Sequence, residues 1–188
     1  MLTAKKITAD FPDMEKVEAL AHEAYPPAEY LAPAKLIELA QGDDFDFLAV
    51  YDGARFVGFV ALQNRDAMVY LYFLAIDPAC RCMGYGGQTL ALLETLYPGC
   101  QQIVDIEMPD DAAPNRFQRQ RRRGFYLRNG YRPTGQFLSY FGMDFELLCK
   151  DDAFDCARFL RMASTLKIDG FHPVPFRKDT EAPSVSST

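Results

Sequence analysis

Hydrophobic and polar positions alternate with two different periods along the chain, and these periods predict its secondary structure. Residues 14–25 and 33–41 place apolar side chains at helical spacing, and proline or glycine follows each segment. From residue 45 to residue 64 the pattern is extended, with two β-rich runs around Asp52-Gly53, a dipeptide typical of a two-residue hairpin turn. We therefore expect two helices followed by a β-hairpin.

The segment MVYLYFLAI, residues 68–76, is apolar almost without interruption. Such a run is expected of a central strand that is covered on both faces of its sheet. Leu90, Leu93 and Leu96 then indicate a helix over residues 84–97. The other expected elements are strands at 5–8, 101–108, 131–140 and 143–149 and helices at 118–129 and 152–165. This order, βααβββαβαββα, predicts an α/β (α+β) fold in which helices cover the faces of a mixed sheet.

Length and composition fit one globular domain. The chain has 188 residues, of which 49% are hydrophobic and 24% charged, and a core of this size can be buried without disulfides or a structural metal. Composition changes only near the end, where proline, serine and threonine replace apolar residues in PVPFRKDTEAPSVSST. We predict a single domain over residues 1–168, which closes with a helix, and a flexible tail over residues 169–188.

Charge and cysteine usage restrict the partners and the compartment. The net charge is −6, so the protein as a whole should repel nucleic acid and anionic membranes. No apolar run reaches the roughly 18 residues of a membrane span, and the first residues lack the apolar core of a signal peptide, so we expect a cytoplasmic protein. The five cysteines are odd in number and lack CxxC spacing, which argues against a disulfide framework and against a metal site.

A basic segment stands out against this acidic background. Six arginines lie within residues 116–128, a composition that suits nucleic-acid binding, but one basic helix without interleaved stacking aromatics is usually a solvated face. Helical spacing puts four side chains along one side: Arg119, Arg122, Arg123 and Tyr126. Some of these arginines could neutralise phosphates, and others could pair with acids such as Asp110 and Asp111.

The motif with the clearest chemistry follows the central strand. Arg81, Gly84 and Gly86 form R-x-x-G-x-G in a polar break that runs directly into the helix of residues 84–97. Consecutive backbone N–H groups and a helix N-terminus make such a loop a cradle for a pyrophosphate, although an ordinary helix start can have the same residues. The third glycine of a dinucleotide-binding fold and the Gly-Lys-Ser/Thr of a Walker loop are both missing.

Two motifs taken together resemble those of the GNAT superfamily of N-acetyltransferases. The family's phosphate loop, R/Q-x-x-G-x-G/A, corresponds to RCMGYG at residues 81–86, and its later F-Y-x-x-x-G-F/Y signature corresponds to FYLRNGY at residues 125–131. The resemblance covers residues 3–149. It implies a mixed, mostly antiparallel sheet of six to seven strands with helices on both faces, splayed at its centre between strands 68–76 and 101–108.

The resemblance also implies an activity: an acyltransferase that moves an acetyl group from acetyl-CoA to a primary amine of a small molecule or peptide, directly and within a ternary complex. The pantetheine arm would hydrogen-bond the central strand like an added strand, and the pyrophosphate would sit on the N–H groups of residues 82–87. The expected contacts of acetyl-CoA are Leu74, Ala75, Ile76, Arg81, Cys82, Met83, Gly84, Tyr85, Gly86, Gly87, Arg119 and Tyr126. Arg81 could instead fix the loop.

Direct transfer requires an acid for the departing thiolate and a base for the amine. Tyr126 matches the tyrosine of the family's second motif and is predicted to act as the acid. Some family members carry a glutamate base on the central strand, but Tyr70 stands at the matching position here. We therefore predict Glu107, at the end of the neighbouring strand, as the base. Asp105 has the same strand-face parity and stays an alternative.

Two regions of the chain bear on the ligand contacts that the family makes. Arg119 stands seven residues before Tyr126, where many relatives have an asparagine that contacts pantetheine, and Asn115 lies further upstream. The turn between the first two helices usually shapes the acceptor pocket in this superfamily. Its candidate lining residues here are Tyr25, Glu29 and Tyr30.

The missing strand glutamate keeps a second function open, a regulatory module that binds acyl-CoA without turning it over. For the transferase we expect acetyl-CoA and an amine as ligands and a monomer or homodimer as the assembly. We expect no metal, no nucleic acid and no membrane among its partners.

Overall fold

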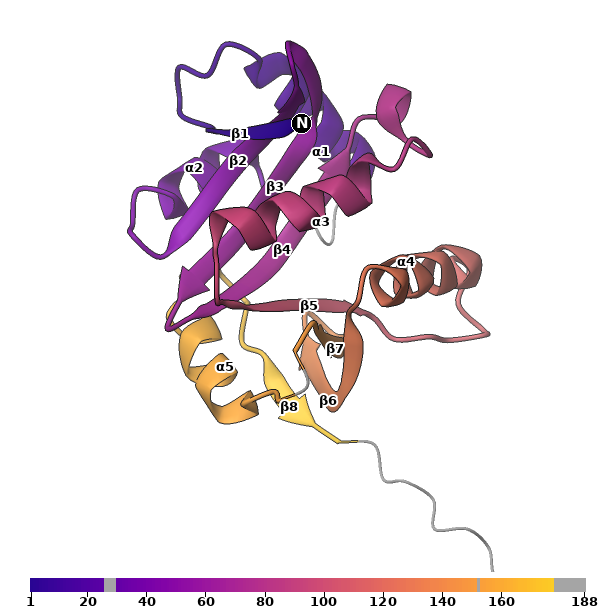
Figure 1. Ribbon diagram of the computed structural model, residues 1–188. Helices are drawn as coiled ribbons and strands as arrows, with labels where there is room; N and C mark the ends of the chain where they lie inside the picture. Colours follow the sequence, from indigo (N-terminus) through magenta and orange to yellow (C-terminus); the bar gives the residue numbers. More distant parts are fainter. Residues whose placement is uncertain (26–29, 152, 178–188) are drawn as a thin grey trace, which may run out of the picture.

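An eight-stranded sheet carries the fold in the computed structural model, which describes residues 1–25, 30–151 and 153–177 (Figure 1). In spatial order the strands are β1 (Leu2–Lys6), β2 (Phe45–Asp52), β3 (Arg55–Arg65), β4 (Met68–Ile76), β5 (Gln101–Glu107), β7 (Met143–Cys149), β6 (Arg132–Tyr140) and β8 (Val174–Phe176). Every neighbouring pair is antiparallel except β4 and β5, which are parallel. The mixed, mostly antiparallel sheet predicted from the sequence is confirmed.

Helices cover both faces of this sheet, as the sequence predicts. One face packs against α1 (Met14–Ala24), α2 (Pro33–Leu39) and α5 (Cys156–Ala163), and the other packs against α3 (Tyr85–Leu96) and α4 (Arg116–Arg128). Alternate residues of β4 face opposite sides: Tyr70 packs with α5, whereas Leu71 packs with α3 and α4. The unbroken apolar run of β4 therefore reflects burial on both of its faces.

Most predicted elements lie within a few residues of their expected bounds, and the differences are local. The first strand begins at Leu2 rather than at Lys5. The hairpin turn consists of Gly53 and Ala54, because Asp52 pairs with Arg55, so it lies one residue later than predicted. The last helix begins at Cys156 and ends at Ala163.

The first part of the segment expected to be a flexible tail is structured. Phe171 is buried, and Val174–Phe176 forms β8, which pairs with β6 at the sheet edge. The sheet thus has eight strands rather than six to seven. Phe171 and Phe176 supply the apolar contacts that hold residues 169–177 in place, and residues 178–188 lie outside the described part of the chain.

The cysteines and the helices bear on the expected compartment of the protein. All five cysteines are free, and Cys82 is exposed. Within the described ranges, no helix has the length and apolar composition that a membrane crossing needs.

Gly58 allows an unusually close approach between β3 and β4. It lies opposite Ile76 in the ladder, and a Cβ added to it would be 2.0 Å from the carbonyl oxygen of Ala75. No side chain fits at that distance without displacing backbone. This contact holds the last residues of β4 against β3.

We predict that Gly58→Ala lowers the free energy of unfolding by about 2–3 kcal/mol, because β3 and β4 must shift apart to admit the methyl group. Urea denaturation at a shared m-value measures the loss. Gly42→Ala is the matched control: its Cβ would lie 3.5 Å from its nearest neighbours, and we expect a change within about 0.5 kcal/mol. Equal effects of both substitutions would contradict the close-approach argument.

Candidate active site

β4 and β5 part from each other at the centre of the sheet. Their parallel pairing joins Met68–Leu71 to Gln101–Val104 and then ends, although β4 continues to Ile76 and β5 to Glu107. In Figure 1 the two strands lie together at one end and diverge toward the other. The splay implied by the sequence resemblance is therefore present.

Two cavities border the parted strands. The larger, of about 360 Å³, we call the aromatic cavity, because Tyr, Phe and a few charged side chains line much of it. The second, of about 330 Å³, we call the loop cavity, because residues 80–87 form one of its walls. Both cavities are lined by Leu74, Arg122 and Tyr126, so they adjoin each other at these side chains.

The loop after β4 presents the N-terminus of α3 to the loop cavity. Asp77 accepts a hydrogen bond from the backbone N–H of Ala79 and so starts a short 3-10 turn over Pro78–Cys80. Gly84 has a φ of 81° and precedes α3, which no side chain caps in the described part of the chain. The N–H groups of the first helical turn therefore remain available for an anion.

The glycines of this loop serve helix packing as well as access for a ligand. A Cβ on Gly86 would lie 3.1 Å from the ring of Phe125, and one on Gly87 would lie 2.7 Å from the side-chain oxygen of Asn129. Both neighbours belong to or follow α4. The sequence explains these glycines by the approach of a phosphate, and the structure adds that they bring α3 and α4 together.

Arg81 is held by protein groups on both sides of the loop. Its Nε donates to the carbonyl oxygen of Ile76 at 3.0 Å, and its guanidinium forms a two-point ion pair with Glu23 of α1, with Nη1 to Oε1 at 2.9 Å. These bonds favour the loop-fixing role for Arg81 over direct phosphate contact.

Most of the residues predicted to contact the donor line the loop cavity. They are Leu74, Ile76, Arg81, Cys82, Gly84, Tyr85, Gly86, Gly87 and Tyr126. Ala75 faces the opposite side of the sheet, where it packs in the core with α1 and α2, so only its backbone could contribute. Met83 is exposed and does not line the cavity. Sequence reasoning missed Cys80 and Phe125, which complete the wall.

Tyr126 lies where the two cavities adjoin. Its ring is buried between Phe125 and Tyr131, with edge-to-face contacts at centroid distances of 5.0 and 5.3 Å. Burial raises the pKa of the Tyr126 phenol above its ordinary value, with a smaller opposing effect from Arg122. The hydroxyl therefore stays protonated at neutral pH and can donate a proton or a hydrogen bond.

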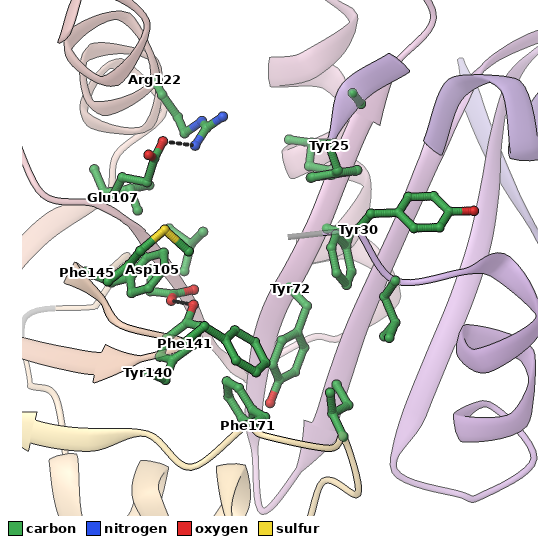
Figure 2. A pocket seen from close by; sticks show the side chains of 18 of the residues that line it. Tyr25, Tyr30, Tyr72, Asp105, Glu107, Arg122, Tyr140, Phe141, Phe145 and Phe171 are labelled. Atoms are coloured by element: carbon green, nitrogen blue, oxygen red, sulfur yellow. Dashed lines mark hydrogen bonds and ion pairs between the residues drawn. The ribbon is translucent and has the colours of Figure 1, made fainter. Parts of the chain in front are cut away.

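Glu107 lines the aromatic cavity, but both of its carboxylate oxygens are already engaged. Arg122 forms an ion pair with it at 3.0 Å (Figure 2). Arg119 forms a second ion pair at 3.0 Å, and Asn115 donates a hydrogen bond at 3.1 Å. This cluster ties α4 to the end of β5. The arrangement favours an anchoring role for Glu107 over the predicted role as base.

The structure gives Arg119 a different position from the predicted one. Arg119 lines neither cavity, because its guanidinium also donates to the Met108 carbonyl at 2.9 Å and to Asn115 at 2.8 Å. The expected contact of Arg119 with the donor stays a prediction; in the structure its side chain turns toward the end of β5. Arg122, one helical turn before Tyr126, lines both cavities instead.

The basic face of α4 is largely neutralised by acids on the sheet. Arg123 forms a two-point ion pair with Glu146 of β7, at 2.7 and 3.1 Å, and Glu146 is only 6% exposed. The partners of these arginines are thus Glu107 and Glu146, and the pairing with Asp110 and Asp111 suggested by the sequence is not observed among the described residues.

Asp105 is the other carboxylate at the start of the splay, and it lines the aromatic cavity. It accepts a hydrogen bond from the Tyr140 hydroxyl, as Figure 2 shows. Burial raises the pKa of the Asp105 carboxyl above its ordinary value, and the bond from Tyr140 opposes this shift. A carboxylate that resists ionisation in this way is a better proton acceptor than an exposed one.

Two of the three candidate acceptor residues line the aromatic cavity. Tyr25 and Tyr30 lie across it from Asp105 in Figure 2, while Glu29 lies outside the described residues. Tyr70, which replaces the strand glutamate of some relatives, is fully buried and does not line the cavity. Burial raises the pKa of the Tyr70 phenol, so it is no base.

No group of three or more His, Cys, Asp or Glu side chains is arranged to hold a metal ion within residues 1–25, 30–151 and 153–177. The chemistry that the two cavities offer is a cradle of N–H groups, a protonated phenol at their junction and a carboxylate beyond it.

Comparisons with known proteins agree with this geometry. Residues 43–133 match the family model of the acetyltransferase (GNAT) domain. A protein of Bacteroides thetaiotaomicron assigned to the GNAT acetyltransferases has a TM-score of 0.68 and 23% identity, over 83% of this chain and 90% of that one. The ribosomal-protein-S18-alanine N-acetyltransferase of Escherichia coli has a TM-score of 0.57 and 16% identity, over 82% and 96%.

Two structures of aminoglycoside 6′-N-acetyltransferase, one from Enterococcus faecium and one complexed with coenzyme A, each match with a TM-score of 0.60 and 15% identity, over 81% of this chain and 99% of theirs. At these identities the structures show a shared fold. No curated protein sequence gave a match. The matched domain, the two sequence motifs and the splayed sheet agree, and residues 43–133 form an acetyltransferase domain of the GNAT superfamily.

Proposed function

We propose that this protein transfers an acetyl group from acetyl-CoA to a primary amine, directly and within a ternary complex. The observation that carries the proposal is the position of Tyr126, whose buried ring lines both the loop cavity and the aromatic cavity. A donor held in the first cavity and an amine held in the second would meet beside its hydroxyl. A small molecule and the end of a peptide both satisfy this requirement.

The residues around the loop cavity fit acetyl-CoA. The uncapped N-terminus of α3 suits a pyrophosphate, and the edge of β4 beyond Leu71 has no ladder partner on β5. That edge could accept the amide groups of a pantetheine arm, with Leu74 and Ile76 beside it. The bound donor supplies a thioester, whose carbonyl carbon is the electrophile.

The proton transfers can be assigned to two side chains. The incoming ammonium first loses one proton to Asp105, and the neutral nitrogen then attacks the thioester carbon. As the new C–N bond forms and the C–S bond breaks, Tyr126 gives its proton to the departing sulfur. The second proton of the nitrogen restores the phenol, and Asp105 releases its proton to solvent, so the products are an amide, a thiol and one free proton.

Asp105 is preferred over Glu107 as the base because their surroundings differ. Glu107 is held by two guanidinium groups and an amide. Asp105 accepts a hydrogen bond from Tyr140, lies near the Tyr70 hydroxyl and forms no ion pair with a described residue. Glu107 then acts as a positioning residue, which keeps Arg122 and α4 in place.

The donor cradle can be tested with a charge placed in the loop. Cys82 is exposed and lines the loop cavity, so Cys82→Glu adds a negative charge there without disturbing the core. We expect acetyl-CoA to bind about tenfold more weakly by calorimetry, through repulsion of its phosphates. Cys82→Gln has the same shape without the charge and should bind normally. Equal affinities of the two variants would place the phosphates elsewhere.

The role of Tyr126 is tested by removing its hydroxyl. We expect Tyr126→Phe to lower kcat by about 10²-fold while the affinity for acetyl-CoA is unchanged, because only the proton donor is lost. Tyr131→Phe is the control, since Tyr131 is an equally buried ring neighbour that lines neither cavity. Acetyl-CoA binding without thiol release by the wild type, over a broad amine panel, would favour the regulatory module.

Asp105→Asn and Glu107→Gln should separate catalysis from stability. Folding raises the pKa of Asp105, so its ionised form opposes folding above the ordinary carboxylate pKa. At pH 7, Asp105→Asn should keep or increase the free energy of unfolding, yet lower kcat/KM by about 10²-fold. Glu107→Gln weakens two ion pairs and should cost about 1–3 kcal/mol of stability.

The pH profile distinguishes the two carboxylates. In the wild type, kcat/KM should fall as the pH drops through the pKa of Asp105, because the protonated carboxyl cannot accept a proton. Asp105→Asn should remove this acidic limb, and Glu107→Gln should keep it. Loss of the limb in Glu107→Gln with its retention in Asp105→Asn would reverse the assignment.

A further inference from the structure

The aromatic cavity has a composition that restricts its occupant. Of its 20 described lining residues, nine are aromatic: Tyr25, Tyr30, Tyr72, Phe73, Tyr126, Tyr140, Phe141, Phe145 and Phe171. Its volume, about 360 Å³, lies near the lower end of the usual range for ligand pockets. A small and largely apolar ligand fits such a space best.

The rings beside Asp105 form a continuous, fixed surface. Tyr140 stacks on Phe145 with centroids 4.1 Å apart, and Phe171 contacts the edges of Tyr140 and Tyr72 at 5.0 and 5.6 Å. Figure 2 shows Tyr140, Phe141, Tyr72 and Phe171 gathered at one end of the cavity. Because these rings support one another, a flat ring inserted among them would make edge and face contacts at little ordering cost.

The charges of the cavity suit a single ammonium group. Asp105 forms no ion pair with a described residue, while Glu107 is engaged by Arg119 and Arg122. Asp169 also lines the cavity but is exposed, so an ion pair there would be worth little. A cation next to Asp105 that also lies over the face of one of these rings is favoured further.

The backbone of Phe141 gives a second reason to assign a binding role to this end of the aromatic cavity. It is the first residue of the two-residue turn between Tyr140 and Met143, and its φ is 51°. Such turns favour Asn or Gly at this position, and a bulky side chain there is strained. The Phe141 ring is nevertheless 46% exposed and lines the aromatic cavity. The chain thus accepts backbone strain at a side chain that stays nearly half exposed at the cavity, which points to a role in binding.

We propose that the acceptor is a primary monoamine carried on an aromatic ring by a short linker, as in the arylethylamines. This inference rests on the proposed acetyl transfer. The amine nitrogen lies toward Asp105 and Tyr126, and the ring lies among Tyr140, Phe141 and Phe171. A polyamine or an aminoglycoside would bury further ammonium or hydroxyl groups against these rings, and each unpaired polar group would weaken binding.

The test compares amines in two separate assays. Calorimetry with the coenzyme A complex measures binding of 2-phenylethylamine, 1,5-diaminopentane and kanamycin, and thiol release from acetyl-CoA measures their turnover. We expect 2-phenylethylamine to bind and to react at least about tenfold better than the other two, because its ring is buried. Equal or better binding of the diamine or of kanamycin overturns the inference.

The two assays separate this inference from the proposed function. Preferred binding of 2-phenylethylamine without thiol release from any amine would overturn the transferase and leave the binding preference standing. Thiol release with 1,5-diaminopentane or kanamycin in preference to 2-phenylethylamine would support the transferase and overturn the monoamine assignment.

Phe141 provides the matched variants. Phe141→Asn gives the turn a residue that tolerates its φ, so we expect the Tm to stay within about 3 °C of the wild type, while KM for 2-phenylethylamine rises about three- to tenfold. Phe117→Ala is the control, since Phe117 is 65% exposed on α4 and lines neither cavity. An unchanged KM in Phe141→Asn would overturn the placement of the ring.

Discussion

The parallel ladder between β4 and β5 ends after four residue pairs, and the rest of the site depends on this break. A continuous ladder would satisfy the backbone groups of both strands but would leave no space between them. Beyond Leu71, β4 keeps its place through its other edge, where its pairing with β3 continues to Ile76 opposite Gly58. The two halves of the sheet can therefore diverge, and a cavity opens on the divergence without loss of the core on either side.

Because the sheet is split at this point, α4 has no flat sheet surface to pack on. Ion pairs with the sheet help to hold the helix in place. Glu107 and Glu146, each 6% exposed, hold three arginines of this helix against β5 and β7. Buried carboxylates of this kind are strongly destabilising when they lose their partners, so they specify one position of the helix. Because Arg122 and Tyr126 lie one turn apart on α4, that position also sets where the two cavities adjoin.

Much of this fold could be predicted from the sequence, because long periodic segments and two spaced motifs report directly on local structure. The strand β8 could not, since three residues carry no periodicity. The direction of the Arg119 side chain could not be predicted for a different reason: a motif gives a position in the chain but not the rotation of α4 about its axis. Asp105 and Glu107 share a strand face, and only contacts from a distant helix reveal which of them is held by cations.

The ion pair between Arg81 and Glu23 links the loop that would hold the donor to the aromatic cavity. Arg81 belongs to the loop that would hold the donor, and Glu23 lies in the last turn of α1, directly before Ala24 and Tyr25 of the aromatic cavity. A two-point ion pair thus joins one wall of each site. Any shift of the loop when one substrate binds would be passed to the wall that meets the other, and thermodynamic reciprocity requires each substrate to alter the affinity of the other by the same factor.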